Sequence, residues 1–344
     1  MKKYELEVNN LIVHFGKAEL LESFMERVWP IFDMELDSHR GETYQYKFLQ
    51  VNVAKIDDDY FVFGRLMQRM NLKARQRLSK NNHLVLTNDE LQSDPTSIFL
   101  IRLYDHKLFV IPEQPRSPRS KTFKYVISKL LNEAHLNLYL KERAEFLRSK
   151  GVQRFSKDLR QQFEKEFDDK WPEPEVALNP IGSKAAVEEI LDVFEIVKSL
   201  RLEYHKTNNE DYELDEELIS KFGQSVNRTN SDKALQEYRN NKDGLNFESV
   251  ENLVKASTQT GGNCNFKMTG VSSTGETVTR TEEHTKITPK IEAESDWSIE
   301  RFGKVAAKRL ADLIEDGQIK LATIVNVEES KELAKKIFNT LRNR

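Results

Sequence analysis

The chain has 344 residues, of which 38% are hydrophobic and 32% are charged. Its 19 Phe, 10 Tyr and 3 Trp supply bulky core material, which excludes a largely disordered chain. A single Cys excludes a disulfide framework and a cysteine-ligated zinc module. Lys and Arg total 53 against 56 acidic residues, a balance that argues against a nucleic-acid coat or a polybasic membrane anchor.

The expected location follows from the distribution of apolar residues. No apolar run approaches the ~18 residues that a membrane-spanning helix needs. The first seven residues alternate polar and apolar side chains and lack the apolar block of a signal peptide. We therefore expect a soluble cytoplasmic protein, and at roughly 150 residues per domain its length predicts two domains.

The first part of the sequence predicts antiparallel strands around a helix. Residues 4–13 are typical of a strand, and residues 17–29 have the apolar spacing of a helix that Pro30 would end. Two hairpins follow, at 43–64 and 97–111, because period-two alternation flanks short polar turns in both. Beyond them, Ser120 is a plausible cap for a long helix over 121–150, and a charged helix is expected over 156–170.

Pro172 and Pro174 mark the expected boundary between a domain at 1–170 and a domain at 171–344. The second domain is expected to contain a strand at 175–179, a helix at 183–200, a strand at 200–205, short helices within 213–257, a long hairpin within 263–291, and helices at 298–313 and 328–341. The predicted fold class is α+β: an antiparallel, hairpin-rich N-terminal domain and a C-terminal domain of helices and antiparallel sheet.

Basic residues are concentrated in two stretches that contain no acid, 64–82 and 115–131. Solvated surface is the ordinary explanation of such a run, but two of them close together favour a positively charged face. If 64–82 is helical, Arg65, Arg69 and Lys73 fall on one side, where they could follow a phosphate backbone. The residues predicted to bind nucleic acid are Arg65, Arg69, Lys73, Arg75, Arg77, Arg116, Arg119, Lys121 and Lys124.

Two further features concern the manner of binding. The second stretch leads into the N-terminus of the helix at 121–150, where free backbone N–H groups favour anions. A weaker basic cluster comprises Arg148, Lys150, Arg154, Lys157 and Arg160. Nothing resembles a base-reading module, so the predicted binding is directed at the backbone, largely independent of sequence, and strongly salt-dependent.

Motifs for catalysis are absent. There is no phosphate-cradling G-x-x-x-x-G-K-[ST] and no G-x-S-x-G, and no two of the seven His residues lie at i, i+4. Cys264 is expected to be a buried structural thiol. We predict no catalytic residue, cofactor or metal ligand, although a metal-dependent nuclease stays open as an alternative. The carboxylate groups that such an enzyme could use are Asp57-Asp58-Asp59, Asp168-Asp169-Lys170, and Glu203 with Lys206.

The order of elements over 43–207 supports a family resemblance. Two hairpins, YQYKFLQVNVAKIDDDYFVF and FLIRLYDHKLFVIPEQPRSP, precede a long helix, the strand EVALNPIG, an amphipathic helix and SLRLEYHKTNN. This layout resembles bacterial proteins of unknown function found with phage-defence genes, and is similar to that of the phage exclusion protein RexA and the Kiwa protein KwaB. The polar hairpin within 262–291 resembles the closing hairpin of such proteins.

The resemblance implies a cytoplasmic, sequence-nonspecific DNA-binding sensor that acts in abortive infection with a membrane or effector partner, and it carries over no catalytic residue. We therefore expect an antiphage-defence DNA-binding protein, in the form of a homodimer. A nuclease is the first alternative. The second is a non-catalytic interaction scaffold that would bind a protein through the acidic stretch 207–217 or through the final helix.

Overall fold

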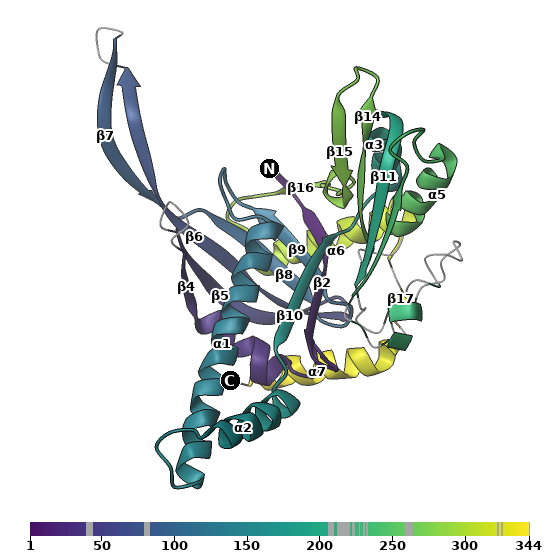
Figure 1. Cartoon of the computed structure of the whole chain (residues 1–344). Helices are drawn as coiled ribbons and strands as arrows, with labels where there is room; N and C mark the ends of the chain where they lie inside the picture. Colours follow the sequence, from purple (N-terminus) through teal and green to yellow (C-terminus); the bar gives the residue numbers. More distant parts are fainter. Residues whose placement is uncertain are drawn as a thin grey trace.

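The computed structural model confirms the α+β fold class, with antiparallel sheets and packed helices (Figure 1). It describes residues 1–38, 44–78, 83–205, 210–211, 221, 224–226, 228–229, 231, 233–258, 264–321, 323–324 and 326–343. At 72–78, 84–89, 184, 210–211 and 323 the description covers the backbone only. None of the helices within these ranges combines the length and the apolar character needed to cross a membrane.

A large antiparallel sheet forms the centre of the molecule, with the strand order β10-β2-β9-β8-β6-β5-β4. Strand β3 pairs with β2, and β7 pairs with β6. The strands are β2 (Glu7–Phe15), β3 (Ala18–Glu19), β4 (Glu35–Ser38), β5 (Tyr44–Ile56), β6 (Asp59–Leu78), β7 (Leu84–Ser93), β8 (Thr96–Arg102), β9 (Lys107–Pro112) and β10 (Pro174–Pro180). Both predicted hairpins are confirmed, as β5–β6 and β8–β9.

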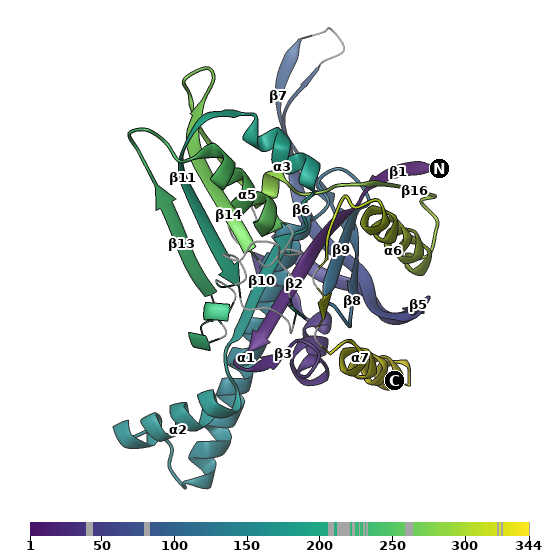
Figure 2. The ribbon, with the colours of Figure 1, turned by 90° about the vertical axis from the view of Figure 1, so that its right-hand side faces the viewer.

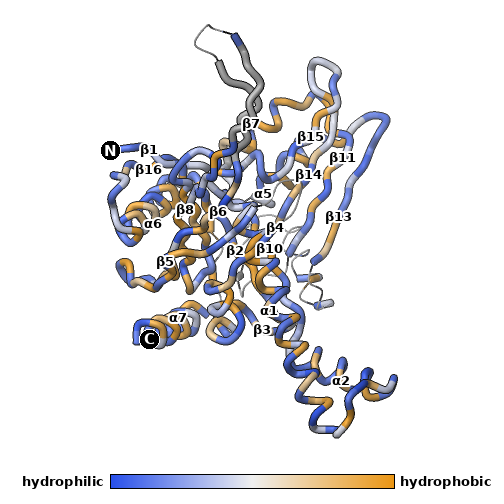
Figure 3. Tube along the Cα trace, turned by 90° about the vertical axis from the view of Figure 1, so that its left-hand side faces the viewer, coloured by the Kyte–Doolittle hydropathy of each residue, from blue (hydrophilic) through white to orange (hydrophobic). Residues whose placement is uncertain are grey.

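Helices cover both faces of this sheet. One core joins the sheet to α1 (Ser120–Ser149), to the short helical turns η1 (Phe24–Val28) and η2 (Trp29–Asp33), and to α7 (Val327–Arg342). The other core joins it to α6 (Ile299–Glu315) and to the pair of strands β1 (Lys2–Glu5) and β16 (Lys290–Ala293). The hydropathy colours follow this packing, since apolar segments are concentrated in the sheet and in these helices (Figure 3).

A second, smaller sheet lies on the other side of the molecule from α6 and α7 (Figure 2). Its strand order is β13-β11-β14-β15, and its own core packs against α3 (Lys184–Leu191) and α5 (Phe247–Thr258). The strands are β11 (Phe194–His205), β13 (Lys233–Arg239), β14 (Cys264–Ser272) and β15 (Thr277–Thr281). Cys264 is buried in this core, as expected. A short pair, β12 (Glu210–Asp211) with β17 (Thr323–Ile324), completes the described strands.

The expected boundary at residue 170 does not separate the two sheets. Pro174 begins β10, which pairs along its whole length with β2, so the chain returns to the large sheet after the two prolines. The last helices, α6 and α7, also pack on the large sheet. Residues on both sides of the expected boundary therefore build one central body, and the smaller sheet is an insertion between β10 and β16.

Three predicted elements differ from the structure. The segment 17–29 forms the short turns of η1 instead of a full α-helix. The helix expected over 183–200 ends at Leu191, and strand β11 begins at Phe194 because this segment pairs with β14 and β13. The basic segment that could have been helical is the extended strand β6, held by ladders to β5, β7 and β8.

Two parts of the chain project from the central body (Figure 1). One is the outer half of the β6–β7 hairpin. The other, which we call the arm, consists of the C-terminal half of α1 and the helix α2 (Lys157–Lys170), joined by a short loop. Ser156 caps α2 through a hydrogen bond from the Leu159 N–H to its Oγ at 3.3 Å.

Candidate nucleic-acid interface

Two of the predicted contact residues, Arg65 and Arg69, lie on strand β6 and are ion-paired. Arg65 Nε is 3.0 Å from Glu113 Oε2, and Arg69 Nε is 2.9 Å from Asp94 Oδ1. Both carboxylates lie beyond the basic stretch in the sequence and reach it through strand pairing. These two arginines therefore hold neighbouring segments of the protein, and their charge is compensated.

Three further predicted residues, Lys73, Arg75 and Arg77, lie in the projecting half of β6. The β6–β7 ladder places the backbone of Lys73 opposite Glu90, and Arg77 opposite Val85. Their side chains are outside the described part of the structure. The proposed helical face of Arg65, Arg69 and Lys73 is wrong, because the segment is a strand.

Arg119 belongs to a charge cluster at the start of α1 that is centred on the buried carboxylate of Glu7. Its guanidinium lies 3.0 Å from Glu7 Oε1 and 2.8 Å from Glu5 Oε2. Lys286 Nζ is 2.9 Å from Glu7 Oε1, and the Ser120 backbone N–H donates to Glu7 Oε2 at 2.9 Å. Burial disfavours the charged form of Glu7, but Lys286 and Ser120 outweigh it and hold the pKa of this carboxyl below its ordinary value. The anion that occupies this helix N-terminus is thus the protein's own Glu7.

Of the three remaining predicted residues, one forms an ion pair with a carboxylate of the described chain and two do not. Lys121 Nζ is 3.5 Å from Glu283 Oε1. Arg116 is exposed, and neither it nor Lys124 has a carboxylate within ion-pair distance among the described residues. Of the four predicted residues at 116–124, Arg119 and Lys121 are therefore paired with acidic residues from other segments, whereas within the described chain Arg116 and Lys124 are not.

Lys124 faces a polar cleft between α1 and the second sheet. A cavity of about 290 Å³ there is lined by Lys124, Asn179, Glu203, His205 and other residues of the sheet. Glu203 Oε1 lies 3.3 Å from Lys233 Nζ. Burial alone would raise the pKa of Glu203, but the contact with Lys233 helps to hold this pKa below its ordinary value. Burial and the nearby Lys124 lower the pKa of His205, which favours its neutral form. The cleft is polar and nearly balanced in charge, so it does not favour a polyanion.

The arm is built around aromatic side chains. Phe163 of α2 lies with its ring centroid 5.3 Å from those of Tyr139 and Phe146 of α1, and 5.4 Å from that of Phe155 in the loop. Phe167 adds a further contact, at 5.1 Å from Tyr139. These contacts hold α2 against α1 outside the main body and fix the geometry of the arm's tip.

Four basic side chains gather around this aromatic cluster at the tip. They line a cavity of about 660 Å³ together with Tyr139, Phe155 and Ser156: Arg143, Arg154, Lys157 and Arg160. All four are exposed, and Arg143 lies over the Phe155 ring at 5.3 Å from its centroid. Only Arg160 has a carboxylate partner among the described residues, Glu164 at 2.8 Å. We call this the arm-tip pocket.

The arm-tip pocket overlaps the weaker of the predicted basic clusters and adds a residue to it. Arg154, Lys157 and Arg160 were recognisable as a run of basic residues near a helix start. Arg143 was missed because it is eleven positions before Arg154 in the chain, and only the fold of the helical hairpin brings the two together. Between Tyr139 and Arg160 the chain has seven basic and three acidic residues.

The carboxylate groups considered for a nuclease are dispersed. Asp58 and Asp59 of the β5–β6 turn face Lys55 and Arg102, at 3.7 Å each. Lys206 lies outside the described residues, and Glu203 is already paired as above. Across the described ranges, no group of three or more His, Cys, Asp or Glu side chains is arranged to hold a metal ion.

The surfaces considered for a scaffold are also only partly visible. The acidic stretch 207–217 lies outside the described residues, except for the two of β12. The apolar side of the final helix α7 is covered by the protein itself, since Ile337 and Leu341 belong to the large core and Phe338 packs 5.1 Å from Tyr60.

Comparison of the chain with models of protein families and with curated proteins found no match.

Proposed function

We propose that this protein binds the sugar–phosphate backbone of duplex DNA through the arm-tip pocket. The observation that supports this proposal is a projecting surface with four exposed basic residues, of which Arg143, Arg154 and Lys157 have no carboxylate partner within the described chain. Basic side chains at other predicted positions, such as Arg65 and Arg119, are already neutralised. Basic side chains that are not already paired can neutralise the phosphates of DNA and displace the counterions bound there, which favours binding.

The manner of binding follows from the residues present. Arg donates hydrogen bonds in a fixed fork that matches phosphate oxygens. The sequence resembles no base-reading module, so we expect the binding to be independent of sequence and to weaken steeply with salt. An arm that stands away from the body lets these residues approach a duplex without a clash from the sheets (Figure 1).

The biological setting belongs to the same proposal and is supported by the layout of elements alone. In this setting the protein acts in the cytoplasm as a DNA-binding component of antiphage defence by abortive infection. A membrane or effector protein of the same system would be its partner, and the protein would act as a homodimer.

The test compares two double variants that remove the same charge. Arg143→Gln with Arg154→Gln removes unpaired arginines, whereas Arg65→Gln with Arg69→Gln removes paired ones. In a gel shift at low salt, the double variant Arg143→Gln with Arg154→Gln should bind a random duplex more weakly by about tenfold or more. It makes fewer phosphate contacts, and its binding therefore releases fewer counterions. The second pair should leave affinity within about twofold.

Equal losses in the two double variants would overturn the assignment to the arm, and absence of binding by the unaltered protein would overturn DNA binding itself. The same reactions with Mg²⁺ report on the nuclease alternative. Degradation of the duplex in a Mg²⁺-dependent manner would replace the proposed non-enzymatic binding with a nuclease.

A further inference from the structure

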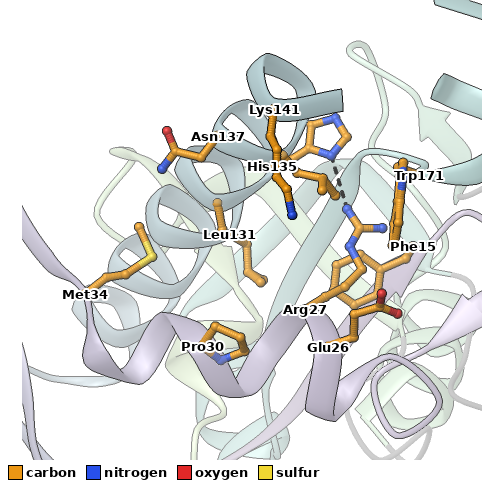
Figure 4. Close-up of a pocket in the computed structure, with 12 residues that line it drawn as sticks. Phe15, Glu26, Arg27, Pro30, Met34, Leu131, His135, Asn137, Lys141 and Trp171 are labelled. Atoms are coloured by element: carbon orange, nitrogen blue, oxygen red, sulfur yellow. Dashed lines mark hydrogen bonds between the residues drawn. The ribbon is translucent and has the colours of Figure 1, made fainter. Parts of the chain in front are cut away.

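The base of the arm contains a second cavity, of about 360 Å³, between α1, the turns η1 and η2, the end of β2 and the residue that follows α2 (Figure 4). We call it the arm-base pocket. Its walls are mainly apolar, and its apolar lining residues are Phe15, Pro30, Met34, Leu131, Ala134, Leu138 and Trp171. A cavity of this size and lining is typical of sites for small organic molecules.

A half-buried guanidinium, that of Arg27, lies in this apolar surrounding (Figure 4). Its Cζ is 4.1 Å from the centroid of the Phe15 ring. Its Nη1 donates to the Pro172 carbonyl oxygen at 2.8 Å, and Nη2 donates to His135 Nδ1 at 3.1 Å. A guanidinium has five N–H donors, so three are left for another acceptor. The two hydrogen bonds, to Pro172 and to His135, hold the Arg27 side chain in one orientation.

The charge of Arg27 is not compensated inside the pocket. Within the described chain, no carboxylate lies within ion-pair distance of its guanidinium, unlike Arg65, Arg102 or Arg119. Burial lowers the pKa of Arg27, and the neighbouring Glu26 opposes this only in part. Arginine nevertheless stays protonated at any ordinary pH. The pocket therefore contains a fixed positive charge that is partly desolvated.

The contact with His135 orients Arg27 without neutralising it. Burial and the proximity of Arg27 lower the pKa of His135, which favours a neutral imidazole that accepts a hydrogen bond at Nδ1. Trp171 contributes its ring to the wall of the pocket. Two exposed charged residues, Glu26 and Lys141, also line the cavity and offset each other in formal charge, so Arg27 leaves its lining with a net positive charge.

We propose that the arm-base pocket binds a small organic carboxylate with an apolar body. The carboxylate would accept hydrogen bonds from Arg27, and the apolar body would fill the space between Phe15, Leu131 and Trp171. Such a ligand supplies both missing components, an anion for the uncompensated guanidinium and apolar surface for the apolar walls. The proposal does not depend on DNA binding, which uses different residues at the other end of the arm.

Isothermal titration of the full chain with 4-phenylbutanoate, and with 4-phenylbutan-1-ol as the uncharged analogue, tests this proposal. We expect saturable binding of one carboxylate per chain, with the alcohol about tenfold weaker or more because it lacks the charge-assisted hydrogen bonds. Arg27→Met should reduce affinity for the acid by a similar factor and leave the alcohol unchanged. Lys165→Met, which removes an exposed charge on α2, is the matched control and should bind as the unaltered chain does.

A second variant keeps the test decisive if Arg27→Met does not fold. Ala134→Phe places a ring in the cavity and retains Arg27, so it should abolish binding of both compounds. Absence of saturable binding to the unaltered chain, equal affinity for acid and alcohol, or full affinity in Ala134→Phe would each overturn the proposal. In that case Arg27 would serve only to fasten η1 to Pro172 and to His135 of α1.

Discussion

The two ends of helix α1 both contain arginine but use it differently. Arg119, at the start, is enclosed by Glu5 and Glu7 from the strands next to it. Arg143, near the other end, lies against the Phe155 ring and beside further basic residues. The same residue type is structural where carboxylates of other strands converge on it, and available for a ligand where the helix extends beyond the sheets.

The difference between the two ends is also one of burial. The side chain of Glu7 is 2% exposed, so its ion pairs with Arg119 and Lys286 are poorly screened. At the arm tip the basic side chains are exposed, and only the aromatic cluster beneath them is packed. Changes at one end should therefore alter stability, and changes at the other should alter binding.

The largest effect is expected from Phe163→Ala, which removes the centre of the arm's aromatic cluster. Phe163 is 3% exposed, and such truncations typically cost about 3–5 kcal/mol. Because the cluster lies outside the main body, we expect α2 amides to exchange with deuterium much faster while β2 amides keep their protection. Phe247→Ala, at a residue that is 39% exposed, is the matched control and should change amide exchange in neither α2 nor β2. Equal loss of protection in both regions would contradict a separately packed arm.

The next effect in size is that of Glu7→Gln. The substitution removes the shared partner of Arg119 and Lys286, and we expect it to lower the free energy of unfolding by about 3 kcal/mol, because two cations lose their buried counter-charge. Urea denaturation measures this. Glu292→Gln, at an exposed and longer ion pair with Lys3, should shift the midpoint very little. If both variants unfolded alike, the cluster at the start of α1 would have no special role.

A smaller effect is expected from pH. Since the pKa of Glu7 lies below its ordinary value of 4.5, its stabilising contribution is complete above pH 4.5 and is lost as the pH falls through the lowered pKa of the folded state. The stability of the unaltered chain should therefore decrease more steeply below pH 4.5 than that of Glu7→Gln. Parallel curves for the two proteins would show that Glu7 has the same pKa folded and unfolded.

Local sequence patterns predicted much of the fold. The hairpins β5–β6 and β8–β9 and the helices α1, α2, α6 and α7 are recognisable from periodicity. The basic run in β6 was ambiguous because residues at i and i+4, such as Arg65 and Arg69, share a face in both a helix and a strand. The segment after Leu191 was misassigned because its apolar spacing fits a helix, while the ladder to β14, formed by residues 60 to 78 positions away, makes it a strand.

The candidate site was harder to predict, because a run of basic residues in the sequence does not reveal which carboxylates will pair with it in the fold. Glu113 is 48 positions from Arg65, and Glu7 is 112 positions from Arg119, so neither pair is visible as a local pattern. The arm-base pocket gave no signal either, since Arg27 and Trp171 belong to segments far apart in the chain. What the sequence did show was the cluster near Arg154, where the important charges are close neighbours.

If the free positive charge that binds DNA lies at the arm tip, the salt dependence of duplex affinity should depend on the arginines there. Each phosphate contact contributes about 0.9 to the slope of log K against log salt concentration. We expect Arg143→Gln with Arg154→Gln to lower this slope by about two, and Arg65→Gln with Arg69→Gln to leave it unchanged. A slope that falls with the second pair and not with the first would contradict the assignment to the arm tip.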